Sequence, residues 1–152
     1  MDHASTSDTE RLILNLLSDY CDRIDRYDVD GLVALFTEDG SYDFGFGRLF
    51  TGRPALRQLF SRVEVYRATS HHISNVHLVV DGDRATARSA LYAFHIRAAD
   101  GSEVHVWGQY FDDVVMQDGS WRIARRALRV AHEKGTVPED GRTTLYEPLP
   151  RA

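Results

Sequence analysis

Residues 84–116 read RATARSALYAFHIRAADGSEVHVWGQYFDDVVM, two long alternating runs separated by an Asp-Gly turn. An alternation of period two is typical of β-strands, and an Asp-Gly pair between two such runs predicts a hairpin. Residues 71–80 and 121–133 show the same alternation, and each is set off from its neighbour by a further Asp-Gly turn. The second half of the chain is therefore predicted to be a meander of long strands.

Helical patterns precede these strands. Apolar residues recur at three- and four-residue spacing in the first part of the chain, after the polar residues 5–8, which can cap a helix. The pattern predicts, in order, a helix over 9–27, a short helix over 31–36 after Asp30, a strand over 41–47, and a helix over 53–66 with Pro54 in its first turn.

Helices followed by antiparallel strands are typical of an α+β fold. We expect a curved, mostly antiparallel sheet wrapped by three N-terminal helices, so that sheet and helices enclose a cone-shaped apolar cavity. Residues 1–133 form a single domain in this prediction. The tail, 134–152, holds three of the four prolines and few apolar residues, which predicts an extended or partly disordered segment.

The composition excludes several classes of function. A net charge of −5 without a basic cluster argues against nucleic-acid binding, since phosphates demand a positive patch. Cys21 is the only cysteine, which rules out a disulfide framework within the chain and suits a cytoplasmic location. The N-terminus is polar and acidic, and no apolar run approaches the roughly 20 residues of a membrane span. We therefore expect a cytoplasmic protein with neither a nucleic-acid nor a membrane partner.

The parity of the strand over 84–98 predicts which of its faces lines the cavity. One face carries mainly small side chains, which leave room for a ligand: Ala85, Ala87, Ser89, Leu91, Ala93 and His95. On the next strand, a face with His105 and Trp107 alternates with a face containing Val106 and Tyr110. Periodicity alone leaves open which of these two faces points inward.

The stretch TSHHISN (69–75) contains two adjacent histidines, which must point to opposite faces of a strand. Asp25 lies one helical turn after Cys21, close to the apolar stripe of the first helix, and a partly buried acid needs a partner. A histidine of the sheet can supply it, leaving its second ring nitrogen as a general base. The alternative is an aspartate that ends the helix beside Arg26, with purely structural histidines.

The segments CDRIDRYDVDGLVALFTEDGSYDF (21–44), TSHHISNV (69–76) and DGSWRIARR (118–126) resemble the SnoaL-like branch of the nuclear transport factor 2-like superfamily. This branch includes polyketide cyclases, scytalone dehydratase, lindane dehydrochlorinase and bile-acid 7α-dehydratase. The resemblance covers residues 8–132. It implies that Asp25 pairs with His71, and that three further side chains assist the reaction: Tyr20, His95 and Arg126.

The sequence differs from members of this family at several site positions. The two water-holding tyrosines of scytalone dehydratase fall at Ile24 and Phe44, and Tyr42 is placed to substitute on the same face. The lysine of the dehydrochlorinase is replaced by Tyr20, which argues against dehydrochlorination. The substrate-binding residues are expected to be Tyr42, Phe44, Leu91 and Trp107, the last as a wall of the cavity.

The implied function is cofactor-independent acid/base chemistry on an apolar cyclic small molecule, in secondary metabolism or catabolism. A dehydratase-type lyase is the first expectation, and an isomerase or cyclase the second. The alternatives are a non-catalytic member, such as the small subunit of a ring-hydroxylating dioxygenase, or a ligand-binding module. We expect no metal, because no HxH or HExxH spacing accompanies His71, His95 and His105. A homo-oligomer, trimer or dimer, is expected because a long sheet exposes one face.

Overall fold

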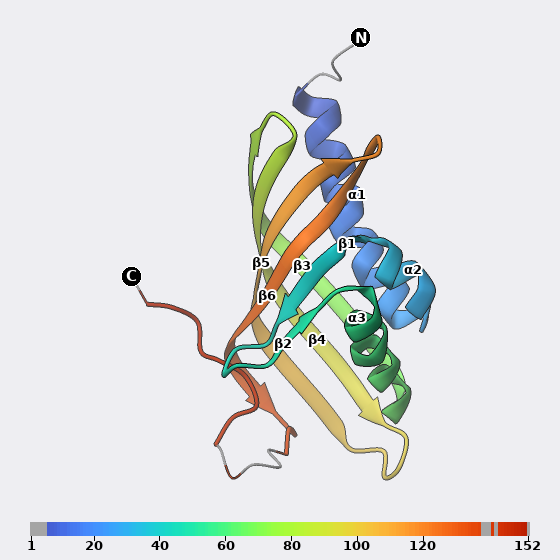
Figure 1. Cartoon of the computed structure of the whole chain (residues 1–152). Helices are drawn as coiled ribbons and strands as arrows, with labels where there is room; N and C mark the ends of the chain where they lie inside the picture. Colours follow the sequence, from blue (N-terminus) through green and yellow to red (C-terminus); the bar gives the residue numbers. More distant parts are fainter. Residues whose placement is uncertain (1–5, 138–140, 142, 152) are drawn as a thin grey trace.

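The computed structural model describes residues 6–137, 141 and 143–151, which fold into three helices and a six-stranded sheet. The helices lie along one side of the sheet (Figure 1). In chain order the elements are α1 (Thr6–Asp25), α2 (Val29–Ala34), β1 (Phe36–Asp43), β2 (Leu49–Thr51), α3 (Arg53–Phe60), the 3₁₀ helix η1 (Ser61–Val65), β3 (Tyr66–Asp81), β4 (Arg84–Arg97), β5 (Glu103–Gln117) and β6 (Ser120–Lys134).

The sheet has the order β2-β1-β6-β5-β4-β3 and is not closed. Strands β3 to β6 form the predicted antiparallel meander, which confirms the α+β fold class. The exception to the antiparallel pattern is β1, which pairs parallel with β6 and places Tyr42 beside Arg126. The sheet is therefore mixed, and its first strand adjoins its last.

Element boundaries in the first half differ from the sequence prediction. The strand predicted over 41–47 runs from Phe36 to Asp43 instead, because α2 ends at Ala34 and the chain enters the sheet directly. Residues 44–48 form a turn, in which Phe46 has a φ of 53° between two glycines with φ near 80°. Phe44 and Phe46, which suggested that the strand continues to residue 47, belong to this turn. The short strand β2, which follows the turn, was not predicted.

The core lies between the helices and the inner face of the sheet. On β4 the predicted inward set is confirmed, since Ala85, Ala87, Ser89, Leu91 and Ala93 are all buried. On β5 the inward set is the one with Val104, Val106 and Tyr110. Trp107, which we predicted to form a cavity wall, is therefore on the outer face, where it is 37% exposed and stacks on His105. That prediction is wrong because both faces of β5 carry large apolar side chains.

A buried ion pair joins β5 to β6 inside this core. The Arg126 Nε and Nη2 atoms donate to the two Asp112 carboxylate oxygens at 2.7 and 2.9 Å, and neither side chain is exposed. The guanidinium carbon lies 4.1 Å from the ring centroids of both Tyr20 and Tyr110. Burial alone would lower the Arg126 pKa, but the Asp112 carboxylate outweighs it and holds that pKa above its ordinary value. Arg126 is therefore a permanent buried cation.

The described part of the tail returns to the sheet. The Val130 backbone N–H donates to the Glu147 carbonyl at 2.9 Å, and the Leu149 N–H donates to the Val130 carbonyl at 3.3 Å. These bonds begin on β6 beyond Ala127, the last β6 residue that pairs with β1. Residues 143–151 thus include an extended arm that occupies the free edge of β6.

Removing Asp112 should destabilise the fold severely. Asp112→Ala leaves the Arg126 charge buried without its partner, which costs about 3–5 kcal/mol of unfolding free energy. The control is Asp113→Ala, because Asp113 is the adjacent residue of β5 and is exposed on the outer face. Urea unfolding at neutral pH measures both variants, and equal unfolding free energies for the two would contradict the structural role given to the pair.

Candidate active site

The Asp25 carboxylate binds two residues of β3. Its Oδ1 accepts hydrogen bonds from His71 Nδ1 at 2.7 Å and from Thr69 Oγ1 at 2.8 Å, and its Oδ2 accepts one from the His71 backbone N–H at 2.8 Å. Asp25 is the last residue of α1, while Thr69 and His71 share one face of β3 because they are two residues apart. The structure therefore brings together the two residues that the family resemblance paired.

The hydrogen bonds keep Asp25 ionised and place a hydrogen on Nδ1 of His71. Partial burial would raise the Asp25 pKa, but the hydrogen bonds from His71 and Thr69 hold it below its ordinary value of 3.8. An ionised carboxylate can only accept, so Nδ1 of His71 carries a hydrogen and donates it to Asp25. The other ring nitrogen, Nε2, is left as the basic atom of the imidazole.

The second histidine of the stretch has a different environment. His72 is exposed, its Nε2 lies 2.8 Å from Ser70 Oγ, and its ring stacks on Tyr92 with centroids 5.9 Å apart. The strand alternation thus places His71 and His72 on opposite faces, as predicted.

His95 lies beside His71. It is the β4 residue that pairs with Thr69, and its ring centroid lies 5.1 Å from that of His71 and 4.6 Å from that of Tyr66. Burial, and then the nearby charge of His71, lowers the His95 pKa to about 4. At neutral pH His95 is therefore an uncharged imidazole.

Three tyrosines form the floor of the site. The rings of Tyr20 and Tyr42 lie 5.9 and 6.5 Å from that of Tyr110, each with an edge toward a face. Burial raises the Tyr20 pKa to about 12, although Arg126 opposes the shift, and burial holds the pKa values of Tyr42 and Tyr110 well above 10. All three hydroxyls stay protonated and can donate hydrogen bonds.

Tyr110 was not among the predicted site residues. It shares its strand face with Val104 and Val106, so its place in the site could have been inferred once that face was known to point inward. Arg126, a predicted site residue, lies behind Tyr20 and Tyr110 and does not itself line the cavity.

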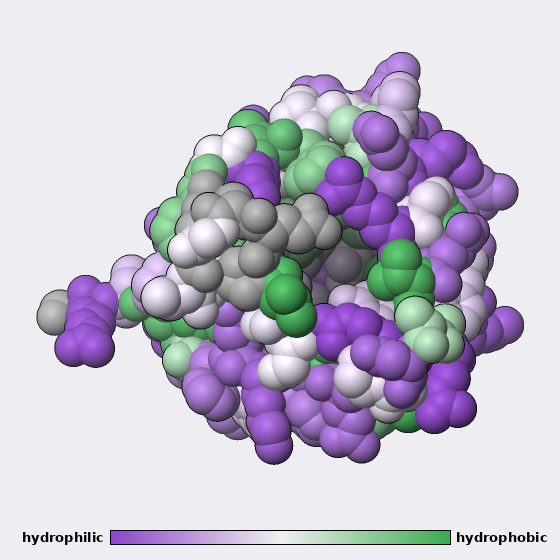
Figure 2. Space-filling view, turned by 90° about the horizontal axis from the view of Figure 1, so that it is seen from below, coloured by the Kyte–Doolittle hydropathy of each residue, from purple (hydrophilic) through white to green (hydrophobic). Residues whose placement is uncertain are grey.

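These groups surround a cavity of about 710 Å³. Figure 2 shows a hollow at the end of the molecule that is lowest in Figure 1. Six of the predicted site residues line the cavity: Tyr20, Tyr42, Phe44, His71, Leu91 and His95. Asp25 supports His71 from behind, and Trp107 does not contribute. A volume of this size accommodates a small organic ligand.

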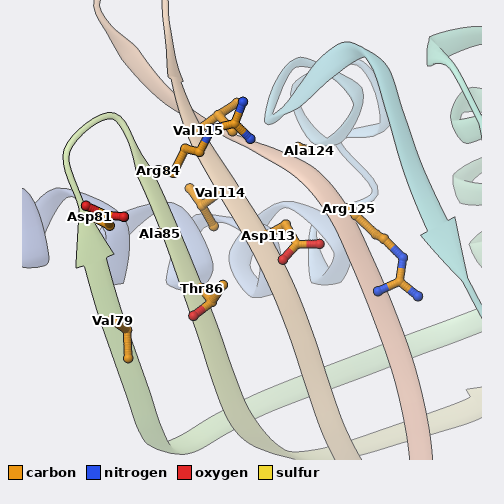
Figure 3. Close-up of a pocket in the computed structure, with 10 residues that line it drawn as sticks. All are labelled: Val79, Asp81, Arg84, Ala85, Thr86, Asp113, Val114, Val115, Ala124 and Arg125. Atoms are coloured by element: carbon orange, nitrogen blue, oxygen red, sulfur yellow. The ribbon is translucent and has the colours of Figure 1, made fainter.

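A second depression, of about 430 Å³, lies away from these groups. Figure 3 shows it across β3 to β6, with α1 behind the sheet and Arg84, Asp113 and Arg125 on the side away from α1. It contains no predicted site residue. The described residues also contain no group of three His, Cys, Asp or Glu side chains that could hold a metal ion, and no helix long and apolar enough to cross a membrane.

Comparisons with known proteins show which family and which structures the chain is similar to. The SnoaL-like domain family matches residues 5–127. An uncharacterised protein of Mycobacterium tuberculosis is 32% identical over 125 residues, which cover 80% of this chain and 85% of the relative.

Solved structures extend the similarity. A candidate scytalone dehydratase from Novosphingobium aromaticivorans superposes with a TM-score of 0.84, at 32% identity and 95% coverage of both chains. A Mycobacterium tuberculosis protein of unknown function gives a TM-score of 0.73 at 37% identity, covering 82% of this chain and 77% of that one. A hexachlorocyclohexane dehydrochlorinase, 16% identical, gives a TM-score of 0.76 over 88% of this chain and 95% of that one, and thus shares the fold.

Loss of the Asp25 charge should cost stability at neutral pH and little in acid. Asp25→Asn weakens hydrogen bonds to a charged acceptor and should lower the unfolding free energy by about 2 kcal/mol at pH 7. Because the folded-state pKa of Asp25 lies below 3.8, the wild-type advantage is present above that pH and is lost as the pH falls through the folded-state pKa. Urea unfolding at several pH values tests this dependence.

The matched control for that experiment is Asp22→Asn. Asp22 lies one turn earlier on α1 and forms an exposed ion pair with Arg26, so its loss should change stability by less than about 0.5 kcal/mol. A stability loss in Asp25→Asn that is as large in acid as at pH 7 would contradict the ionised carboxylate.

His95 should remain neutral well below the pH at which an ordinary histidine is protonated. Since burial lowers its pKa to about 4, its ring ¹⁵N chemical shifts should keep the neutral pattern at pH 5.5. Nuclear magnetic resonance of ¹⁵N-histidine-labelled protein measures this, with His95→Gln identifying the signal. Titration of that signal near 6.5 would show that the ring is not desolvated.

Proposed function

Because the chain belongs to the SnoaL-like domain family, we propose that it is a cofactor-independent acid/base lyase acting on an apolar cyclic small molecule. The observation that carries this proposal is the 2.7 Å contact between Asp25 and His71, whose side chain lines the cavity. With Nδ1 bonded to Asp25, His71 removes a proton through Nε2 from a carbon next to a carbonyl group. The Asp25 carboxylate stabilises the imidazolium that forms.

The tyrosines of the cavity stabilise the negative charge that develops on the substrate. Proton removal places negative charge on the substrate carbonyl oxygen, and the hydroxyls of Tyr20 and Tyr42 can donate hydrogen bonds to that oxygen. Arg126 adds a permanent positive charge behind the rings of Tyr20 and Tyr110. A buried cation beside the developing charge lowers its energy without occupying substrate space.

Elimination of water completes a balanced cycle. The electron pair of the broken C–H bond forms the carbon–carbon double bond, the C–O bond to the leaving hydroxyl breaks, and that oxygen takes the proton held by His71 to leave as water. His95, uncharged at neutral pH, is a hydrogen-bonding anchor in this scheme. Isomerisation would use the same first step and return the proton to another carbon.

A ligand-binding protein without activity is the second candidate. The observation that favours it is that the Asp25 hydrogen bonds also tie the end of α1 to β3, which a purely structural pair would do equally well. The lyase and the ligand-binding protein can be distinguished by removing the His71 imidazole while the cavity stays intact. Only the lyase should then lose activity.

The test compares His71→Ala with His72→Ala. The assay uses a β-hydroxytetralone, which becomes a fluorescent naphthol when it loses water. His71→Ala should lower kcat/KM by at least about 100-fold, the contribution typical of a general base, while His72→Ala should stay within about twofold of wild type.

Equal losses in the two variants would contradict the division of roles between the histidines. Turnover of the hydroxytetralone that His71→Ala leaves unchanged would favour a pocket with no catalytic base. Circular dichroism of both variants checks that the fold is retained.

A further inference from the structure

The Thr69 hydroxyl and the His71 ring share one oxygen of the Asp25 carboxylate. Oδ1 accepts hydrogen bonds from Thr69 Oγ1 at 2.8 Å and from His71 Nδ1 at 2.7 Å, while Oδ2 accepts one from the His71 backbone N–H at 2.8 Å. Each donor on an oxygen withdraws part of its negative charge, which leaves less for the other donor. The strength of the bond between Oδ1 and Nδ1 therefore depends on Thr69.

The carboxylate does not need the Thr69 hydroxyl for its orientation. His71 alone contacts both oxygens, Oδ1 through its ring and Oδ2 through its backbone N–H. These two contacts already oppose rotation of the carboxylate about its bond to Cβ. The effect of the hydroxyl is therefore expected mainly on the charge of Oδ1.

Thr69 lies within the site without touching the ligand space. It pairs with His95 in the register of β3 and β4, and it is not among the residues that line the cavity. Its side chain reaches the Asp25 carboxylate, and Asp25 in turn binds His71. Any influence of Thr69 on the imidazole therefore passes through Asp25.

The uncharged groups near this pair keep their protonation state between pH 5 and 8. Burial raises the pKa of the Cys21 thiol, on α1, to about 11, and it raises the pKa of the Tyr66 hydroxyl, on β3, above its ordinary value of 10. Burial, and then the charge of His71, lowers the pKa of His95, on β4, to about 4. A titration of His71 in this range is therefore free of a change at these three residues.

The charged groups on the neighbouring elements are bonded to one another. On α1, Asp22 forms an exposed ion pair with Arg26. Between β5 and β6, Asp112 accepts two hydrogen bonds from Arg126. A substitution at Thr69 leaves both pairs in place, so they act equally on the wild type and on the variants.

We propose that Thr69 is a positioning residue for the proton between His71 and Asp25, and that its hydroxyl sets the pH range in which His71 Nε2 is free to accept a proton. Without this hydroxyl, Oδ1 carries more charge and stabilises the imidazolium form of His71 more strongly. His71 then keeps its second proton to a higher pH than in the wild type. The inference rests on the proposed function for the identification of His71 as the base.

The experiment follows the His71 ring by nuclear magnetic resonance. In protein labelled with ¹⁵N-histidine the ring shifts report protonation, and His71→Ala identifies the signal. Thr69→Val removes the hydroxyl and keeps the branched side chain, and it should raise the midpoint of the His71 titration by about 0.5 to 1 pH unit. Thr69→Ala should give the same rise, while Thr69→Ser, which keeps a hydroxyl, should stay within about 0.2 pH unit of the wild type.

The matched control is Ser70→Ala. Ser70 follows Thr69 on β3, and its hydroxyl lies 2.8 Å from Nε2 of His72, on the opposite face of the strand. Loss of this hydroxyl should leave the His71 titration unchanged. An unchanged or lowered midpoint in Thr69→Val and Thr69→Ala would overturn the inference, as would an equal rise in Ser70→Ala.

Turnover of the hydroxytetralone separates an effect on the base from a loss of structure. In Thr69→Val the acid limb of the profile of kcat/KM against pH should move to higher pH by the same amount, and the plateau should stay within about twofold of the wild type. A lowered plateau with an unmoved acid limb would show that the hydroxyl only supports the structure, and would overturn the inference.

The titration involves no turnover, so its outcome is separate from that of the proposed function. A raised midpoint in Thr69→Val, in a protein that does not convert the hydroxytetralone, would support the coupling of Thr69 to His71 and count against the lyase. An unchanged midpoint in a protein that converts the hydroxytetralone would refute the coupling and leave the lyase in place.

Discussion

The structure of the site depends on a single carboxylate, that of Asp25. It accepts three hydrogen bonds from β3, two of them from His71, and so holds the C-terminal end of α1 against the sheet. The same bonds orient the imidazole and assign its hydrogen to Nδ1. In the proposed mechanism, fold and chemistry share one constraint, because the bonds that hold the helix also orient Nε2, the proposed base.

Around this pair, burial determines the charge state of the other titratable side chains. His95 is desolvated and therefore neutral, and the three floor tyrosines are desolvated and therefore protonated. Arg126 stays charged in the same interior because Asp112 binds it through two hydrogen bonds. The result is a cavity with the His71 imidazole on one wall and three protonated tyrosines in front of a buried cation. This is the arrangement on which the proposed removal of a proton next to a carbonyl group depends.

The sequence predicted the parts of the fold that depend on local periodicity. The α+β class, the four long strands and the inward face of β4 follow from alternation and Asp-Gly turns, and the resemblance to a known family identified the pair of Asp25 and His71. Features set by long-range contacts were not predictable in this way. The parallel pairing of β1 with β6 has no local pattern, and the turn containing Phe46 mimics a strand. Trp107 and Tyr110 were misjudged because alternating large residues do not reveal which face is inner.

The central claim, that Asp25 acts through His71, is tested most directly by a double-mutant cycle on proton removal. The measurement is the rate of deuterium incorporation next to the carbonyl group of tetralone, which cannot lose water, in wild type, Asp25→Asn, His71→Ala and the double variant. If the two residues act as one unit, the double variant should be no slower than His71→Ala alone. Losses that multiply in the double variant would show that they act independently and would contradict the account.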